Sequence, residues 1–290
     1  MDSTTSPWLD AILRWTHVLA GILWIGHQYF STFVEAQAKK ACGADSTSKL
    51  ASEMMARALY WLRWGAACTW VTGIVLTGLV YYSVTDNLVR REVRFAFKYG
   101  LTTDFTLATN DPVVSQRAGV MISLAIIVVV FLAYEAVWKV LGRYERSAAA
   151  VSLAAFALTL FLLSRVFTGR AVFLHAGALL GSIMAMNVWM RIWPAQKKAI
   201  QAMHGPARAP DTSAQGMAAS RSKHNAYMSV PVVFAMVSNM CDRDDGWAMM
   251  TALVLVGFAL AWALYGIETR RGAAPSPRGM GRTRPALGRP

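Results

Sequence analysis

Long apolar runs with few charged residues alternate along the chain with polar segments that carry most of its Lys, Arg, Asp and Glu residues. Most of the runs have about the 20 residues that a helix needs to cross the apolar core of a bilayer. We place them at about residues 8–34, 59–82, 118–141, 148–167, 171–193, 225–240 and 247–267. The pattern predicts an all-α fold, a polytopic transmembrane helix bundle with about seven spans.

The segments between the runs predict the domain organisation. The stretch 83–117 is the longest polar connection, and its residues 88–101 could form a short helix at the membrane interface. The fifth run is expected to stop at Pro194, after which a long basic loop rich in Pro, Gly and Ala reaches Lys223. We divide the chain into a transmembrane domain, 1–269, and a basic, disordered cytoplasmic tail, 270–290.

The distribution of Lys and Arg predicts the orientation of the helices. The first, third and fifth connections hold clusters of Lys and Arg, whereas the others are balanced, brief or acidic. Cytoplasmic loops of membrane proteins carry the excess of these residues. The N-terminus is therefore expected outside, and the C-terminus with its Arg-rich tail in the cytoplasm.

Composition and charge exclude several classes of function. The net charge of +13 would suggest nucleic acid in a soluble protein, but here topology explains the cations, so we expect the lipid bilayer and no nucleic acid as a partner. Cys42, Cys68 and Cys241 form no CxxC or CxxCH, which leaves neither a zinc site nor a covalent c-type haem. No Ser-His-Asp set, paired carboxylates or phosphate loop is present.

Two histidines lie within the predicted spans at similar depth. His17 and His175 both fall in the outer half of the bilayer, where ionisable residues favour a functional role. Facing helices with matched histidines suit bis-imidazole ligation of haem b iron, although each residue could simply bond a neighbouring helix. Gly21, Trp24 and Gln28 share the helix face of His17, and either a cofactor site or ordinary helix packing explains them.

The remaining histidines differ in what they suggest. His27 cannot share a small site with His17, and a structural hydrogen bond is expected for it. His224 precedes the sixth span and forms a dense polar group with Asn225, Tyr227 and Ser229. That group is either a functional site or a solvated helix cap with interfacial anchors.

Four blocks of the sequence resemble one known family. They are RWTHVLAGILWIG (14–26), AYEAVWK (133–139), HAGALLGSIMAMNVWMRIWPAQKK (175–198) and RSKHNAYMSVPVVFAMVSN (221–239). These blocks are similar to the membrane-embedded N-terminal region of the bacterial cytochrome-c-linked urate oxidases, also called urate hydroxylases.

The resemblance implies a function and a set of site residues. It implies oxidation of urate or a related purine to 5-hydroxyisourate in the bacterial inner membrane, with electrons passed to a c-type cytochrome. It implies catalytic roles for His224, Asn225 and Tyr227. His17, His175 and His224 fall on histidine positions of the family. Together with the matched depth of His17 and His175, this favours a haem b site at that pair, with Trp24 and Gly21 beside it.

The chain departs from the family pattern in two places. No CxxCH motif follows the last span, so a separate periplasmic cytochrome is the expected electron acceptor. Met240 stands where the family is expected to have His after Ser238 and Asn239. These departures keep two alternatives open: a transporter or non-catalytic membrane subunit on the same scaffold, and a haem b redox protein with another substrate.

Overall fold

The computed structural model describes residues 7–35, 48–83, 88, 112–204, 212–237 and 246–272, and every regular element in these ranges is helical. The label η marks short π-helical segments. The elements are α1 (Pro7–Tyr29), η1 (Phe30–Glu35), α3 (Ser48–Thr77), η2 (Gly78–Tyr82), α4 (Pro112–Val140), α5 (Glu145–Val166), α6 (Gly169–Asn187), η3 (Val188–Ile192), α7 (Trp193–His204), α8 (Thr212–Val237) and α9 (Gly246–Gly272).

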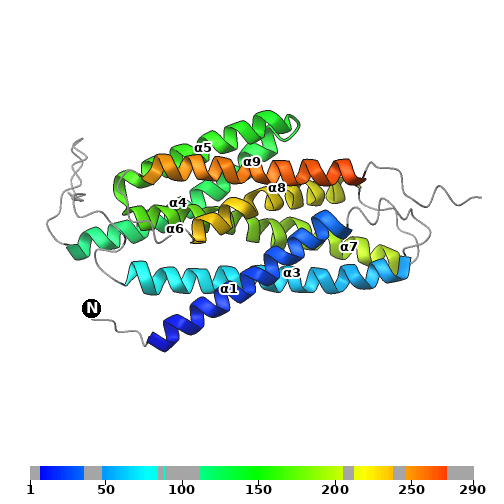
Figure 1. Ribbon diagram of the computed structural model, residues 1–290, viewed down its shortest axis with the longest axis horizontal. Coiled ribbons are helices and arrows are strands. Elements are labelled where there is room, and N and C mark those ends of the chain that lie inside the picture. The colour runs from blue at the N-terminus through cyan, green and yellow to red at the C-terminus, as the bar shows by residue number, and fades with distance from the viewer. Residues whose placement is uncertain are drawn as a thin grey trace, which may run out of the picture.

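The π-helical segments continue the helices that precede them, and η3 also joins α6 to α7. Within the described residues the elements therefore form seven helical runs, because α1–η1, α3–η2 and α6–η3–α7 are each continuous. Figure 1 shows the runs as an elongated bundle in which successive runs point in opposite directions. The all-α prediction is confirmed.

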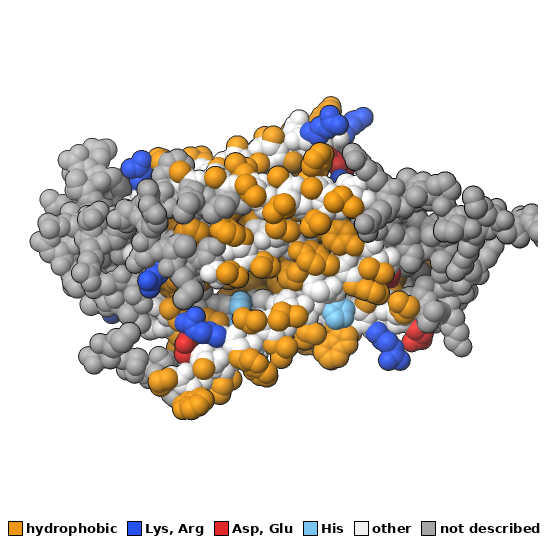
Figure 2. All heavy atoms as spheres, viewed as in Figure 1, with side chains coloured by type: hydrophobic (Ala, Val, Ile, Leu, Met, Phe, Trp, Pro, Cys, Tyr) orange, Lys and Arg blue, Asp and Glu red, His pale blue; other side chains and the backbone are white. Residues whose placement is uncertain are grey.

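Five of the runs are long and apolar enough to cross a membrane. They are Pro7–Glu35, Glu53–Tyr82, Gln116–Val140, Glu145–Val166 and Gly169–Ala202. In α9, the described residues include a shorter apolar stretch, Val254–Leu264. Figure 2 shows apolar side chains over the middle of the molecule, with charged side chains toward its two ends. These features indicate a multi-pass membrane protein; the orientation and the count of seven spans stay predictions.

The run that begins with α6 lies at the centre of the bundle. Its apolar window is 72% buried, whereas the windows of the other four candidate spans are 6% to 28% buried. It packs against α3, α4, α5, α8 and α9. Gly177 permits close packing on α8, because a Cβ atom there would lie 2.5 Å from Cε of Met236. Side chains on α6 therefore meet several helices at once.

The helix does not stop at Pro194, contrary to the sequence prediction. It widens into η3, where the N–H of Trp193 donates to the carbonyl of Val188, and then continues as α7. Proline lacks an N–H and its ring clashes with the carbonyl four residues earlier in a regular helix. The π-helical turn relieves both problems, because it changes the hydrogen-bond spacing just before Pro194.

The predicted loop before the sixth span is also partly helical. Helix α8 begins at Thr212, so Lys223 and His224 lie within a helix rather than at its start. Pro231 lies inside α8 and packs on α9, since a Cβ atom at Gly257 would lie 3.2 Å from the proline ring.

Several predicted features lie outside the described residues. They include the possible interfacial helix at 88–101, apart from Leu88, as well as Met240 and residues 273–290 of the tail. The boundary between the domain and the tail stays a prediction.

Candidate functional site

Polar side chains from α4, α6, η3 and α8 meet inside the bundle. This group, the polar cluster, consists of Tyr134, Glu135, Asn187, Arg191, Arg221, His224 and Asn225. Asn225 is fully buried, and Asn187 and Arg221 are 1% and 7% exposed. Buried polar groups need protein partners because water cannot reach them. The burial of the cluster therefore disagrees with the solvated helix cap that the sequence left open as an alternative for His224 and Asn225.

Two asparagines link α6 to α8. Nδ2 of Asn225 donates to the carbonyl of Met184 over 3.0 Å, and Nδ2 of Asn187 donates to Oδ1 of Asn225 over 2.9 Å. Nδ2 of Asn187 also donates to the hydroxyl of Tyr134 over 3.2 Å. The amide pair thus holds three helices in register.

The phenol of Tyr134 connects this amide pair to His224. Its oxygen lies 2.8 Å from Nδ1 of His224 and already accepts a hydrogen bond from Asn187. The phenol proton is therefore assigned to the bond with His224, whose Nδ1 accepts it. The rings of Trp138 and His224 pack with centroids 3.9 Å apart.

An acidic residue binds two arginines at the edge of the cluster. Glu135 accepts from Arg191 over 2.9 Å and from Arg221 over 3.0 Å. The guanidinium of Arg221 also lies over the ring of Tyr134, 4.7 Å from its centroid. Because Arg221 is bound on two sides, its position relative to Tyr134 is fixed.

Four buried polar atoms around the cluster have no hydrogen-bond partner among the described residues. They are Oδ1 of Asn187, Nη1 of Arg221, Nε of Arg191 and Nε1 of Trp138. A buried polar atom without a partner is unfavourable by about 1–3 kcal/mol. One acceptor and three donors suit a small planar molecule that carries both carbonyl and N–H groups.

The charge state of His224 follows from its surroundings. Burial, then the positive charges of Arg221 and Lys223, lower the pKa of His224 to about 3. The neutral imidazole therefore predominates near neutral pH, and its Nδ1 can accept a proton.

Tyr227, the third predicted catalytic residue, lies on α8 three positions after His224 and is half-buried. The structure thus brings His224 and Asn225 into one network, while the role of Tyr227 stays a prediction.

The helix face that carries His17 packs against α3. Nδ1 of His17 lies 3.1 Å from Oγ1 of Thr72, and its ring covers Gly73, where a Cβ atom would lie 3.1 Å from Cε1. Trp24 is 3% exposed on the same face, and a Cβ atom at Gly65 would lie 3.0 Å from its backbone nitrogen. Gly21 faces Thr69 across the same contact. This face serves helix packing.

Both ring nitrogens of His175 have protein partners. Nδ1 donates to the carbonyl of Ala171, so Nε2 accepts from the hydroxyl of Ser123 on α4. Ser123 in turn accepts a hydrogen bond from the hydroxyl of Tyr82. The ring of Phe167 stacks on the ring of His175, with the two centroids 4.7 Å apart. A continuous chain of hydrogen bonds therefore runs from Tyr82 to α6.

These contacts test whether the two histidines fit a bis-imidazole haem. As arranged, His17 faces α3, His175 faces α4, and His175 offers no ring nitrogen to an iron atom. The residues do not fit such a haem in this arrangement, and we assign no chemical step to one. Ligation by this pair stays a prediction that requires His175 to leave Ser123.

His27 forms the structural bond expected of it. Its Nδ1 donates to the carbonyl of Leu23 over 2.7 Å. Gln28, one residue later, donates to the backbone oxygen and hydroxyl of Ser222 over 3.1 and 3.0 Å, which joins α1 to α8.

A comparison with models of protein families gives one match. Residues 44–272 match the model described as urate oxidase N-terminal. The chain belongs to the urate oxidase N-terminal family. A search of curated proteins found no match, and a search of solved structures found none either.

The urate oxidase N-terminal match covers the polar cluster and leaves out the first span. All seven cluster residues and His175 lie within 44–272, whereas His17, Gly21 and Trp24 precede it. The resemblance at 133–139, 175–198 and 221–239 falls inside the matched range, and the block 14–26 does not.

Five members of the polar cluster were not predicted as site residues from the sequence, namely Tyr134, Glu135, Asn187, Arg191 and Arg221. Glu135 carried a usable signal, because an acidic residue inside an apolar run requires a partner. Arg191 and Arg221 are the partners, but no spacing in the sequence relates either of them to Glu135.

Proposed function

We propose that this chain is a membrane-embedded oxidoreductase that hydroxylates urate, or a related purine, to 5-hydroxyisourate. Membership of the urate oxidase N-terminal family supports the substrate class. The observation that carries the proposal is the buried polar cluster with its unpartnered donors and acceptor. Urate is planar and bears carbonyl and N–H groups around its rim, which matches that set in kind.

Six of the seven cluster residues have a role in this proposal. Asn187 and Arg221 bind the rim of the purine through Oδ1 and Nη1, the atoms that have no protein partner. Asn225 and Glu135 hold these two side chains in place. Tyr134 and His224 relay a proton as the substrate is oxidised: the phenol takes up the substrate proton while its own proton moves along the existing hydrogen bond to Nδ1 of the neutral imidazole.

The reaction balances with water and a one-electron carrier. Urate and one water give 5-hydroxyisourate, two protons and two electrons; the new bond joins C5 of the purine to the water oxygen. An O–H bond of the water and an N–H bond of urate break, and the two protons pass one after the other to the Tyr134–His224 pair and on to solvent. Two molecules of a separate c-type cytochrome accept the electrons, one each.

The proposal is tested on membranes that contain the full chain. Urate and oxidised cytochrome c are added, and urate consumption and cytochrome reduction are followed together. We expect both to occur in these membranes and neither in membranes without the chain. A chain that moves urate across vesicles without reducing cytochrome c is a transporter, and this result contradicts the proposal.

A further inference from the structure

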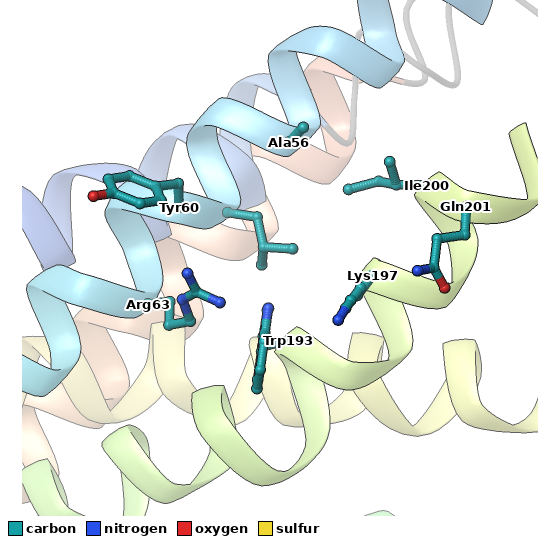
Figure 3. Close-up of a pocket in the computed structure, with 8 residues that line it drawn as sticks. Ala56, Tyr60, Arg63, Trp193, Lys197, Ile200 and Gln201 are labelled. Carbon is teal, nitrogen blue, oxygen red and sulfur yellow. The ribbon is translucent and has the colours of Figure 1, made fainter. Parts of the chain in front are cut away.

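A pocket opens between α3 and α7, away from the polar cluster. It has a volume of about 320 Å³, and its lining residues are Ala56, Leu59, Tyr60, Arg63, Trp193, Lys197, Ile200 and Gln201. Figure 3 shows the labelled side chains of the two helices on either side of this space. Its size falls at the lower end of the range of ligand sites.

Two cations and no carboxylate line the pocket. The guanidinium of Arg63 lies over four aromatic rings, the nearest being Trp193 at 4.7 Å from the ring centroid. Its Nε is buried without a hydrogen-bond partner among the described residues. Nζ of Lys197 lies 5.7 Å from the ring centroid of Trp193. The ring of Trp193 thus contacts both cations, and the lining contributes no counter-charge.

Apart from the amide of Gln201 and the hydroxyl of Tyr60, the rest of the lining is apolar, and this narrows the choice of anion. Ala56, Leu59 and Ile200 offer only hydrocarbon, and the pocket lies beside exposed aromatic residues of α3. Tyr60, Trp61 and Trp64 are 51%, 49% and 43% exposed. Exposed aromatic rings near the end of a candidate span are typical of the layer where lipid headgroups meet acyl chains. An occupant with an anionic head and an apolar tail suits both halves of the lining.

The position along α3 agrees with this occupant. The candidate span Glu53–Tyr82 begins close to Ala56, and Lys197 lies near the end of the span Gly169–Ala202. This end of the bundle carries the basic connections and is the expected cytoplasmic end. Anionic phospholipids bind basic pockets between helices on that side of a membrane.

We propose that the pocket between α3 and α7 binds the phosphate of an anionic phospholipid of the inner leaflet. Arg63 and Lys197 bind the phosphate, and the acyl chains lie along Leu59 and Ile200 toward the bilayer. This site is separate from the proposed urate site and does not depend on it.

The test uses the full chain purified in neutral detergent. Thermal unfolding is measured during titration with phosphatidylglycerol, phosphatidylcholine or inorganic phosphate. We expect phosphatidylglycerol alone to raise the unfolding temperature. Lys197→Gln should raise the lipid concentration needed for half of this effect about fivefold, the value for one surface cation. Lys198→Gln is the matched control, because Lys198 is exposed on α7 and does not line the pocket.

Arg63→Gln should also weaken the stabilisation by phosphatidylglycerol. Because this variant also loses the contacts of Arg63 with four aromatic rings, Lys197→Gln is the variant that tests the proposal. Equal stabilisation by phosphatidylcholine would overturn the proposal. So would equal stabilisation by inorganic phosphate, which would make the ligand a free anion. An equal loss in Lys198→Gln would show a general effect of surface charge and would also overturn it.

Discussion

The phenol oxygen of Tyr134 lies 2.8 Å from Nδ1 of His224, although 90 positions separate the two residues in the chain. The same oxygen accepts a hydrogen bond from Asn187, so the Tyr134 proton is assigned to His224. This relationship joins α4 to α8 and places a proton-accepting imidazole behind a phenol. The proposed chemistry depends on it.

Tyr134→Phe removes the phenol hydroxyl and keeps the ring. We expect the rate of urate oxidation to fall about 100-fold or more, because a positioned proton acceptor contributes at least that much. The rate is measured from cytochrome c reduction by the purified variant. Tyr144→Phe is the control, since Tyr144 is 65% exposed; equal rates in the two variants would remove Tyr134 from the mechanism.

Glu135→Gln removes the charge that binds Arg191 and Arg221. We expect the free energy of unfolding in detergent to fall by about 2 kcal/mol, because charged hydrogen bonds are lost and Arg221 stays buried. Glu145→Gln breaks an exposed pair with Lys223 and should change that free energy by less than about 1 kcal/mol. The account of the cluster fails if the two variants unfold at the same temperature.

Gly65→Ala places a methyl group against the backbone of α1. The new Cβ atom would lie 3.0 Å from the nitrogen of Trp24 and 3.3 Å from the carbonyl oxygen of Ala20. Because backbone atoms cannot rotate away, we expect a loss of about 1–3 kcal/mol in unfolding free energy. Gly26→Ala should be neutral or slightly stabilising, since a Cβ atom there meets nothing within 4 Å. Similar thermal stability of both variants would contradict the packing of α1 on α3.

The pH profile of activity reports the charge of His224. Its pKa is lowered to about 3, so the base form should persist and kcat/KM should show no acidic loss from His224 between about pH 5 and 8. Lys223→Met removes one of the cations that lower this pKa, so the acidic limb should move to higher pH. Lys198→Met should leave the limb in place. If kcat/KM of the wild-type protein instead falls at about pH 6.5, the ordinary pKa of histidine, the burial of His224 described above would be contradicted.

The contacts of His175 predict the absorption spectrum of the purified protein. Because both of its ring nitrogens bind protein groups, we expect no haem band that depends on this residue. The spectrum of wild-type protein is compared with those of His175→Ala and His27→Ala. A Soret band that His175→Ala alone abolishes would show that His175 leaves Ser123 to ligate iron.

The apolar runs were enough to predict an all-α bundle, because helices that face lipid on most sides need long stretches of apolar residues. The π-helical turn before Pro194 left no such signal, since it depends on how the surrounding helices pack. His224 and Asn225 stood out as polar residues close together in sequence. Their partners Tyr134 and Asn187 lie on other helices, and only the three-dimensional arrangement relates them.

The expected depth of His17 and His175 in the bilayer did not predict which residues they contact. His17 and His175 were matched by their expected depth in the bilayer, but depth does not fix which helices face each other. In the structure α1 packs chiefly on α3, so the ring of His17 contacts Thr72 and Gly73. One sequence supplies no information on that pairing of helices.

The most direct test of the proposed function measures the source of the new oxygen and the fate of the electrons together. The purified full chain is given urate and oxidised cytochrome c in water enriched in oxygen-18. We predict one labelled oxygen in each 5-hydroxyisourate molecule and two cytochromes reduced for each urate consumed. Unlabelled product, or urate consumed without cytochrome reduction, would contradict hydroxylation by water with electron transfer to cytochrome c.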